Sequence, residues 1–129
     1  MILGLLVSLP KLAHAETDNG YTQLMPMAHT YVTLMLCAGT AFEFKQDEDA
    51  GYRFDAKANL LIERSMSSGW DLHQISIATL EATENRQGVV LMDDDTIESF
   101  NMRYYSGQPC AKALVRANDM LKGEDFPRP

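Results

Sequence analysis

The chain has 129 residues, of which 46% are hydrophobic and 22% are charged, and its formal net charge is -7. This length fits one domain, and this composition is that of a globular protein rather than a disordered one. Because an acidic chain repels phosphate backbones, the charge argues against nucleic acid as a partner.

The first fifteen residues are typical of a signal peptide. Residues 2–9 are nearly all apolar but too few to span a bilayer as a helix. Ala13 and Ala15 are small, as a signal peptidase requires, so we expect cleavage after Ala15 and a periplasmic or secreted protein. No Lys or Arg precedes the apolar run, and Lys11 follows it, which is unusual for such a segment. The alternatives are a translation start further upstream and a buried N-terminal strand.

The chain has two cysteines, Cys37 and Cys110, which are too far apart for a Cys-x-x-Cys redox or zinc motif. In an oxidising compartment, two distant cysteines are expected to form one structural disulfide. If the protein is not exported, the alternative is a pair of independent buried thiols.

Residues 16–23 are polar, and we expect them to be flexible. Residues 24–44 are the most apolar stretch of the mature chain, with no charge before Glu43. Apolar side chains recur at helical spacing on most sides, which predicts a helix in the middle of a bundle. Its length also fits a membrane span. Because it contains Pro26, His29 and several threonines, we expect no stable membrane insertion.

The next elements are predicted from capping residues. Residues 46–51 look like a polar turn, and Asp55 can cap a second helix over about residues 56–67. Gly69 would end that helix. Asp71 would open a third helix that runs to about residue 84, although its isoleucines also allow a short strand.

The last third of the chain predicts two more helices. Residues 89–92 are apolar and could form a strand or one helical turn. Asp95 and Glu98 match a capping box, which predicts a fourth helix up to Gly107. Pro109 suits the first turn of a fifth helix that ends at Gly123. The predicted inner face of the fifth helix consists of Cys110, Ala113, Leu114, Ala117 and Leu121.

These elements predict an all-α protein, an irregular four- to five-helix bundle with one disulfide. The helical domain would occupy residues 24–123, followed by a flexible tail over residues 124–129. The disulfide would tie the first turn of the last helix to the middle of the central one.

No motif for catalysis, cofactor binding or metal binding passes a spacing test. The Asp47-x-Asp49-x-Gly51 pattern has Tyr52 and Ala58 where a calcium loop needs glycine and glutamate. The two histidines of the mature chain, His29 and His73, fit no zinc motif. There is no glycine-rich phosphate loop and no Gly-x-Ser-x-Gly elbow. We therefore predict no catalytic residues, no cofactor and no metal.

The candidates for contact with a partner are aromatic or acidic. Trp70 lies between two predicted helices, and Tyr105 points away from the buried stripe of the fourth helix. Asp93, Asp94 and Asp95 form an acidic run, which is more often a solvated surface. For Trp70, the alternative is that it fills the seam between the helices. Lys112 and Arg116, one turn apart, give the end of the chain a basic character.

We therefore expect a small exported, non-enzymatic protein of the bacterial cell envelope that binds another protein, of a binding, inhibitor or immunity type. Its expected size, charge and architecture resemble those of exported immunity proteins, which neutralise toxins, but no motif carries this likeness. The alternatives are a small periplasmic hydrolase that uses a carboxylate pair and a membrane-associated subunit anchored by residues 24–44.

Overall fold

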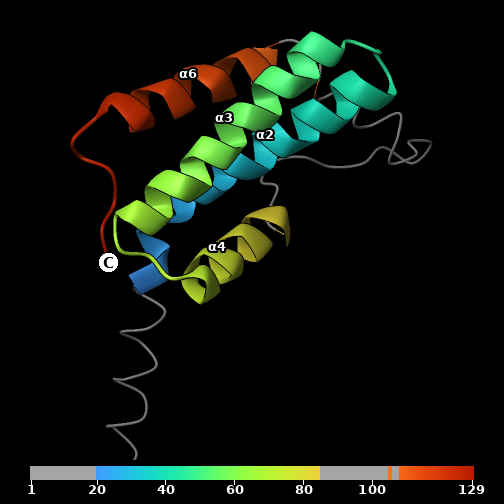
Figure 1. Cartoon of the computed structure of the whole chain (residues 1–129). Coiled ribbons are helices and arrows are strands. Elements are labelled where there is room, and N and C mark those ends of the chain that lie inside the picture. Colours follow the sequence, from blue (N-terminus) through green and yellow to red (C-terminus); the bar gives the residue numbers. More distant parts are fainter. Residues whose placement is uncertain (1–19, 85–104, 106–107) are drawn as a thin grey trace, which may run out of the picture.

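A computed structural model of the chain describes residues 20–84, 105 and 108–129. This part of the chain contains α2 (Met25–Glu43), α3 (Glu48–Ser67), α4 (Leu72–Glu84) and α6 (Gln108–Lys122), and no strand. The helix α2 contacts each of the other three. Figure 1 shows α6 and α4 on opposite sides of the pair formed by α2 and α3. The predicted all-α bundle with one disulfide is confirmed.

The core forms around α2, as its apolar sequence predicts. Leu24, Met27 and Leu34 are fully buried, and so are the threonines at positions 30 and 40. The hydroxyl groups of Thr30 and Thr40 donate hydrogen bonds of 2.9 Å to the carbonyl oxygens of Pro26 and Leu36. Because these hydroxyls are paired within the helix, α2 can be buried on most sides without leaving polar groups unsatisfied.

The neighbouring helices meet α2 through alanines. Five of them are essentially inaccessible to solvent, on three different helices: Ala58, Ala78, Ala82, Ala113 and Ala117. The distance between two packed helices depends on the side chains at their contact, so alanine lets the backbones approach closely. These alanines therefore complete a continuous core together with large side chains such as Leu24, Met27 and Leu34.

The start of α3 differs from the prediction. The helix begins at Glu48, and its N-cap is Asp47, whose carboxylate accepts a hydrogen bond of 3.1 Å from the amide of Ala50. The prediction that Asp55 caps this helix is wrong, because Asp55 lies inside it. Gly51, predicted as part of a turn, is also helical and is buried. Because the helix already includes Gly51, the turn before it is shorter than predicted, and it contains Gln46, where φ is 51°.

The predicted break between α3 and α4 is confirmed. Gly69 adopts a φ of 108°, the left-handed conformation that commonly follows a helix end. The Asp71 carboxylate accepts a hydrogen bond of 2.8 Å from the Gln74 amide, and the Gln74 side chain accepts one of 3.1 Å from the Asp71 amide. This reciprocal pairing is a capping box, and it starts α4 where the sequence predicts a helix. The residues that also allowed a strand are helical.

The helix α6 matches its predicted limits, and its buried residues are Cys110, Ala113 and Ala117. Residues 124–129 differ from the flexible tail that we expected. Phe126 is 5% exposed, and the ring nitrogen of Trp70 donates a hydrogen bond of 2.8 Å to the carbonyl oxygen of Pro127. The C-terminal residues are therefore packed against the end of α3.

Several predictions concern residues outside the described part of the chain. They are the signal peptide over residues 1–15, most of the 16–23 segment, the apolar run 89–92, and the fourth helix with its Asp95 cap. For the described helices, none has both the length and the hydropathy needed to cross a membrane.

Candidate functional site

The disulfide between Cys37 and Cys110 fixes the position of α6. The two Cα atoms are 5.9 Å apart, and both cysteines are buried. The bridge joins the middle of α2 to the first turn of α6, as the sequence predicts. Since one end of α6 is covalently attached and its alanine face is buried, the opposite face of this helix has a defined orientation towards solvent.

Both aromatic residues proposed as partner contacts are buried. Trp70 is 2% exposed and belongs to the buried core, as the alternative interpretation requires, although its hydrogen bond goes to Pro127 in the C-terminal residues rather than to another helix. Tyr105 is 4% exposed and packs beside the disulfide, so the expectation that it faces away from the core is wrong. Neither ring offers a surface for a partner in this structure. The acidic run Asp93, Asp94 and Asp95 lies outside the described residues.

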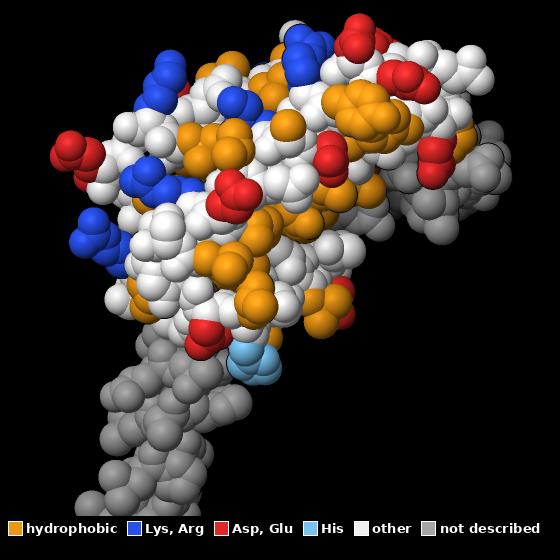
Figure 2. Space-filling view, in the orientation of Figure 1, with side chains coloured by type: hydrophobic (Ala, Val, Ile, Leu, Met, Phe, Trp, Pro, Cys, Tyr) orange, Lys and Arg blue, Asp and Glu red, His pale blue; other side chains and the backbone are white. Residues whose placement is uncertain are grey.

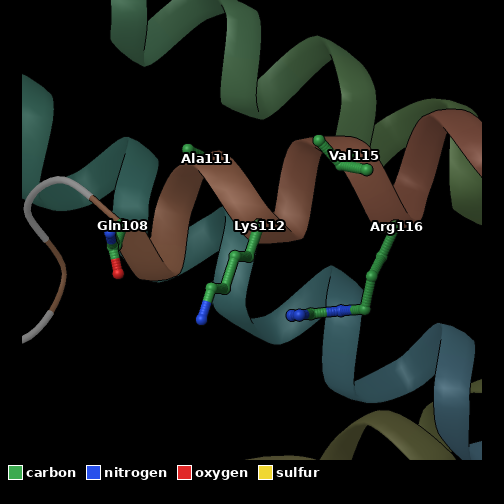
Figure 3. Close-up of a pocket in the computed structure, with 5 residues that line it drawn as sticks. All are labelled: Gln108, Ala111, Lys112, Val115 and Arg116. Carbon is green, nitrogen blue, oxygen red and sulfur yellow. The ribbon is translucent and has the colours of Figure 1, made fainter.

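The outer face of α6 forms a shallow, open pocket of about 440 Å³ (Figure 3). Its described lining consists of residues at helical spacing on the side away from the buried alanines: Gln108, Ala111, Lys112, Val115 and Arg116. Residues three and four positions apart lie on the same helix face, so this surface follows directly from the sequence once the buried face is known.

This face combines an apolar side chain with two cations. Val115 is 59% exposed, about as much as Leu72 and Leu80 elsewhere on the surface, so its cationic neighbours rather than its exposure distinguish this face. Lys112 and Arg116 are exposed too, and Figure 3 shows that both extend from α6 to the same side. Neither forms an ion pair or a side-chain hydrogen bond with a residue that the structure describes. The face can therefore receive an apolar group that has carboxylates beside it.

The surrounding surface reinforces this positive character. On the face of the molecule that Figure 2 shows, most Lys and Arg side chains lie towards α6 and the C-terminal residues. Asp and Glu side chains predominate on the rest of that face. The whole chain has 18 acidic and 11 basic residues. A basic surface on an acidic protein is an electrostatic asymmetry that can orient a charged partner as it approaches.

Other large hydrophobic residues are exposed, but their surroundings differ. Tyr52 on α3 and Leu72 and Leu80 on α4 are each more than half exposed. None of them lines the α6 pocket. Single exposed hydrophobic residues are common on protein surfaces and need no functional explanation.

A second pocket, of about 330 Å³, lies beside the disulfide. Its polar side chains are Lys45, Asp47 and Arg53, and Phe54 and Tyr105 contribute aromatic surface. Among its described lining residues, Asp47 is the only acidic one, and its carboxylate caps α3. A hydrolase of the carboxylate-pair type needs two acidic groups that converge, and the described lining of this pocket provides one.

The two described histidines, His29 and His73, differ in their exposure to solvent. His29 is half-buried in α2, and His73 is exposed on α4. In the described ranges, no group of three or more His, Cys, Asp or Glu side chains is arranged to hold a metal ion.

No protein-family model matches the chain, and neither the curated proteins nor the solved structures contain a match.

Proposed function

We propose that this is a small exported protein that binds another protein, and that it does so through the outer face of α6. The observation that carries the proposal is the exposed Val115 beside two cations, Lys112 and Arg116, that form no ion pair with any described residue, on a helix fixed by the disulfide. Charge complementarity defines the partner: an acidic segment of another protein in which carboxylates flank an apolar side chain.

The disulfide supports the exported location. Bridges of this kind persist in oxidising compartments and are rare in the cytosol. The signal-like residues 1–15 lead to the same location, in the periplasm or outside the cell. The mass of the protein from the envelope fraction tests this part directly. We expect residues 1–15 to be missing and two hydrogen atoms to be lost from Cys37 and Cys110.

The partner can be captured with a photo-crosslinking amino acid in place of Val115. The same amino acid in place of Leu80, which is 61% exposed on α4, provides a matched control. We expect one acidic envelope protein to be crosslinked from the Val115 position and not from the Leu80 position. A product that forms equally from both positions would contradict the proposal.

Binding to the purified partner then tests the charges. We expect Arg116→Glu to weaken the affinity at least about tenfold, since reversing a charge in a complementary interface converts an attraction into a repulsion. Lys45→Glu makes the same charge change on an exposed residue outside α6 and should leave the affinity unchanged. Equal effects of the two variants would show that only the overall charge matters. A dimer of this chain that Arg116→Glu dissociates would identify a second copy as the occupant.

Two other functions have less support. The described lining of the α6 pocket has no acidic residue, and that of the pocket beside the disulfide has one, so the described residues of neither pocket supply a carboxylate pair. For a subunit anchored by residues 24–44, the apolar surface of α2 would have to face lipid. It faces α3, α4 and α6 instead.

A further inference from the structure

A third pocket, of about 450 Å³, lies where the C-terminal residues pack against the end of α3. Two arginines from distant parts of the chain line it, Arg64 on α3 and Arg128 in the C-terminal segment. The rest of its described lining is Ser67, Ser68 and Gly69, with no acidic side chain. Both arginines line one pocket, and its described lining adds no acidic side chain to offset them, in a chain with a net charge of -7.

Contacts outside the pocket hold the Arg64 side chain and the backbone that precedes Arg128. The Arg64 guanidinium lies 5.4 Å from the centre of the Phe126 ring, and its Nη2 donates a hydrogen bond of 3.1 Å to the carbonyl oxygen of Gly123. The carbonyl oxygen of Pro127 accepts a hydrogen bond from Trp70. The backbone on the N-terminal side of Arg128 is therefore fixed beside the end of α3, so a ligand would not have to order it.

The pocket still has free hydrogen-bond donors. Arg64 uses Nη2 for Gly123 and keeps other N–H groups available. Within the described residues, Arg128 and the Ser68 hydroxyl have no hydrogen-bond partner or ion pair for their side chains. The Ser67 hydroxyl already donates its hydrogen to the carbonyl oxygen of Arg64, so it has no further O–H group to offer a ligand.

We propose that this pocket binds a phosphate group, as inorganic phosphate or as a phosphate monoester. Such a group carries a charge of about -2 near neutral pH and has three oxygens that accept hydrogen bonds, which matches two guanidinium groups and a hydroxyl. A carboxylate, with one charge, would neutralise only one of the arginines. A phosphodiester of nucleic acid has the same single charge, so it would be a weaker ligand as well. This site is separate from the α6 face and does not depend on the proposed partner.

The test is an NMR titration of the oxidised mature protein at constant ionic strength, with inorganic phosphate, methyl phosphate, acetate and chloride as the added anions. We expect saturable shifts of the Ser68 and Gly69 amide signals with phosphate, at a dissociation constant of about 1 mM or below. The indole N–H signal of Trp70, the only tryptophan, should move with them. Tighter binding of methyl phosphate than of inorganic phosphate would indicate an ester as the ligand, and the reverse would indicate the free ion.

Two variants with the same charge change make the result specific. Arg128→Gln should weaken phosphate binding at least about tenfold, because it removes a charge-assisted hydrogen bond at the ligand. Arg116→Gln removes one positive charge from α6 and should leave phosphate binding unchanged. For the protein partner, Arg116→Gln should weaken binding and Arg128→Gln should not. A failure of one proposal can therefore be told from a failure of the other. The phosphate proposal is overturned by an absence of saturable shifts, by equal weakening in both variants, or by acetate binding as tightly as phosphate.

Discussion

Gly51 of α3 lies directly against the ring of Phe42 at the end of α2: a Cβ atom built on this glycine would come within 2.6 Å of two ring carbons. This contact explains why a glycine occupies the first turn of a helix. The absence of a side chain lets the start of α3 pack onto the end of α2, where Phe42 also meets Tyr52 edge to face at 5.0 Å.

The first prediction concerns this contact. Alanine normally stabilises a helix relative to glycine by about 1 kcal/mol. Here we expect Gly51→Ala to lower the free energy of unfolding by about 1–2 kcal/mol, because the added methyl group displaces the Phe42 ring. Urea unfolding followed by circular dichroism measures the change. In a Phe42→Ala background, the same substitution should become stabilising. If its sign is the same in both backgrounds, the contact is not responsible.

The second prediction tests the corrected start of α3. Asp47→Ala should destabilise the protein by about 1 kcal/mol, since it removes the side chain that accepts the Ala50 amide hydrogen bond. Asp55→Ala provides a matched control, because Asp55 lies within the helix and, among the described residues, its carboxylate accepts just one long hydrogen bond of 3.4 Å, from the Asn59 side chain. We expect this control to change stability by less than about 0.5 kcal/mol. A larger loss of stability in Asp55→Ala than in Asp47→Ala would instead indicate that Asp55 caps the helix.

The third prediction concerns the disulfide. Its cysteines are 73 positions apart, and closing a loop of that length is expected to stabilise the folded state by about 4 kcal/mol through the entropy of the unfolded chain. Replacing both Cys37 and Cys110 by alanine should lower the free energy of unfolding by about that amount. Comparing the oxidised and the reduced wild-type protein in the same urea series checks that the effect comes from the bridge. Equal stability of the two forms would contradict this prediction.

The fourth prediction concerns the packed C-terminal residues. Phe126→Ala should destabilise the protein by about 3 kcal/mol, as for other truncations of a buried phenylalanine. Because Trp70 would lose its contact with Pro127, its fluorescence should also shift to longer wavelength. Val115→Ala, on the exposed face of α6, is the control and should change neither quantity. An unchanged emission spectrum in Phe126→Ala would mean that these residues do not cover Trp70.

The sequence predicts the elements that depend on neighbours along the chain. The Asp71 cap, the Gly69 stop and the alanine face of α6 are local patterns, and all three are confirmed. The early start of α3 was missed, because the pattern Asp47-x-Asp49-x-Gly51 is also typical of a turn, although Asp47 is an N-cap residue followed by two acidic residues. The close approach of Gly51 to Phe42, which belongs to another helix, could not be predicted from neighbours along the chain.

The candidate sites also combine features that follow from local sequence with features that depend on packing. The spacing of Lys112 and Arg116 places them on the same side of a helix, whereas the exposure of Val115 depends on which face of α6 is buried. Arg64 and Arg128 are brought together only by the packing of the C-terminal residues, so no spacing rule could connect them. The one signal in the sequence was Phe126, an aromatic residue in an otherwise polar tail.

The bridge between α2 and α6 also determines what happens when the backbone is cut. The helices α3 and α4 both lie on the chain between the two cysteines. A protease that hydrolyses a single peptide bond in this interval would therefore nick the protein without separating its fragments. Both fragments would migrate together in electrophoresis until a reducing agent released them.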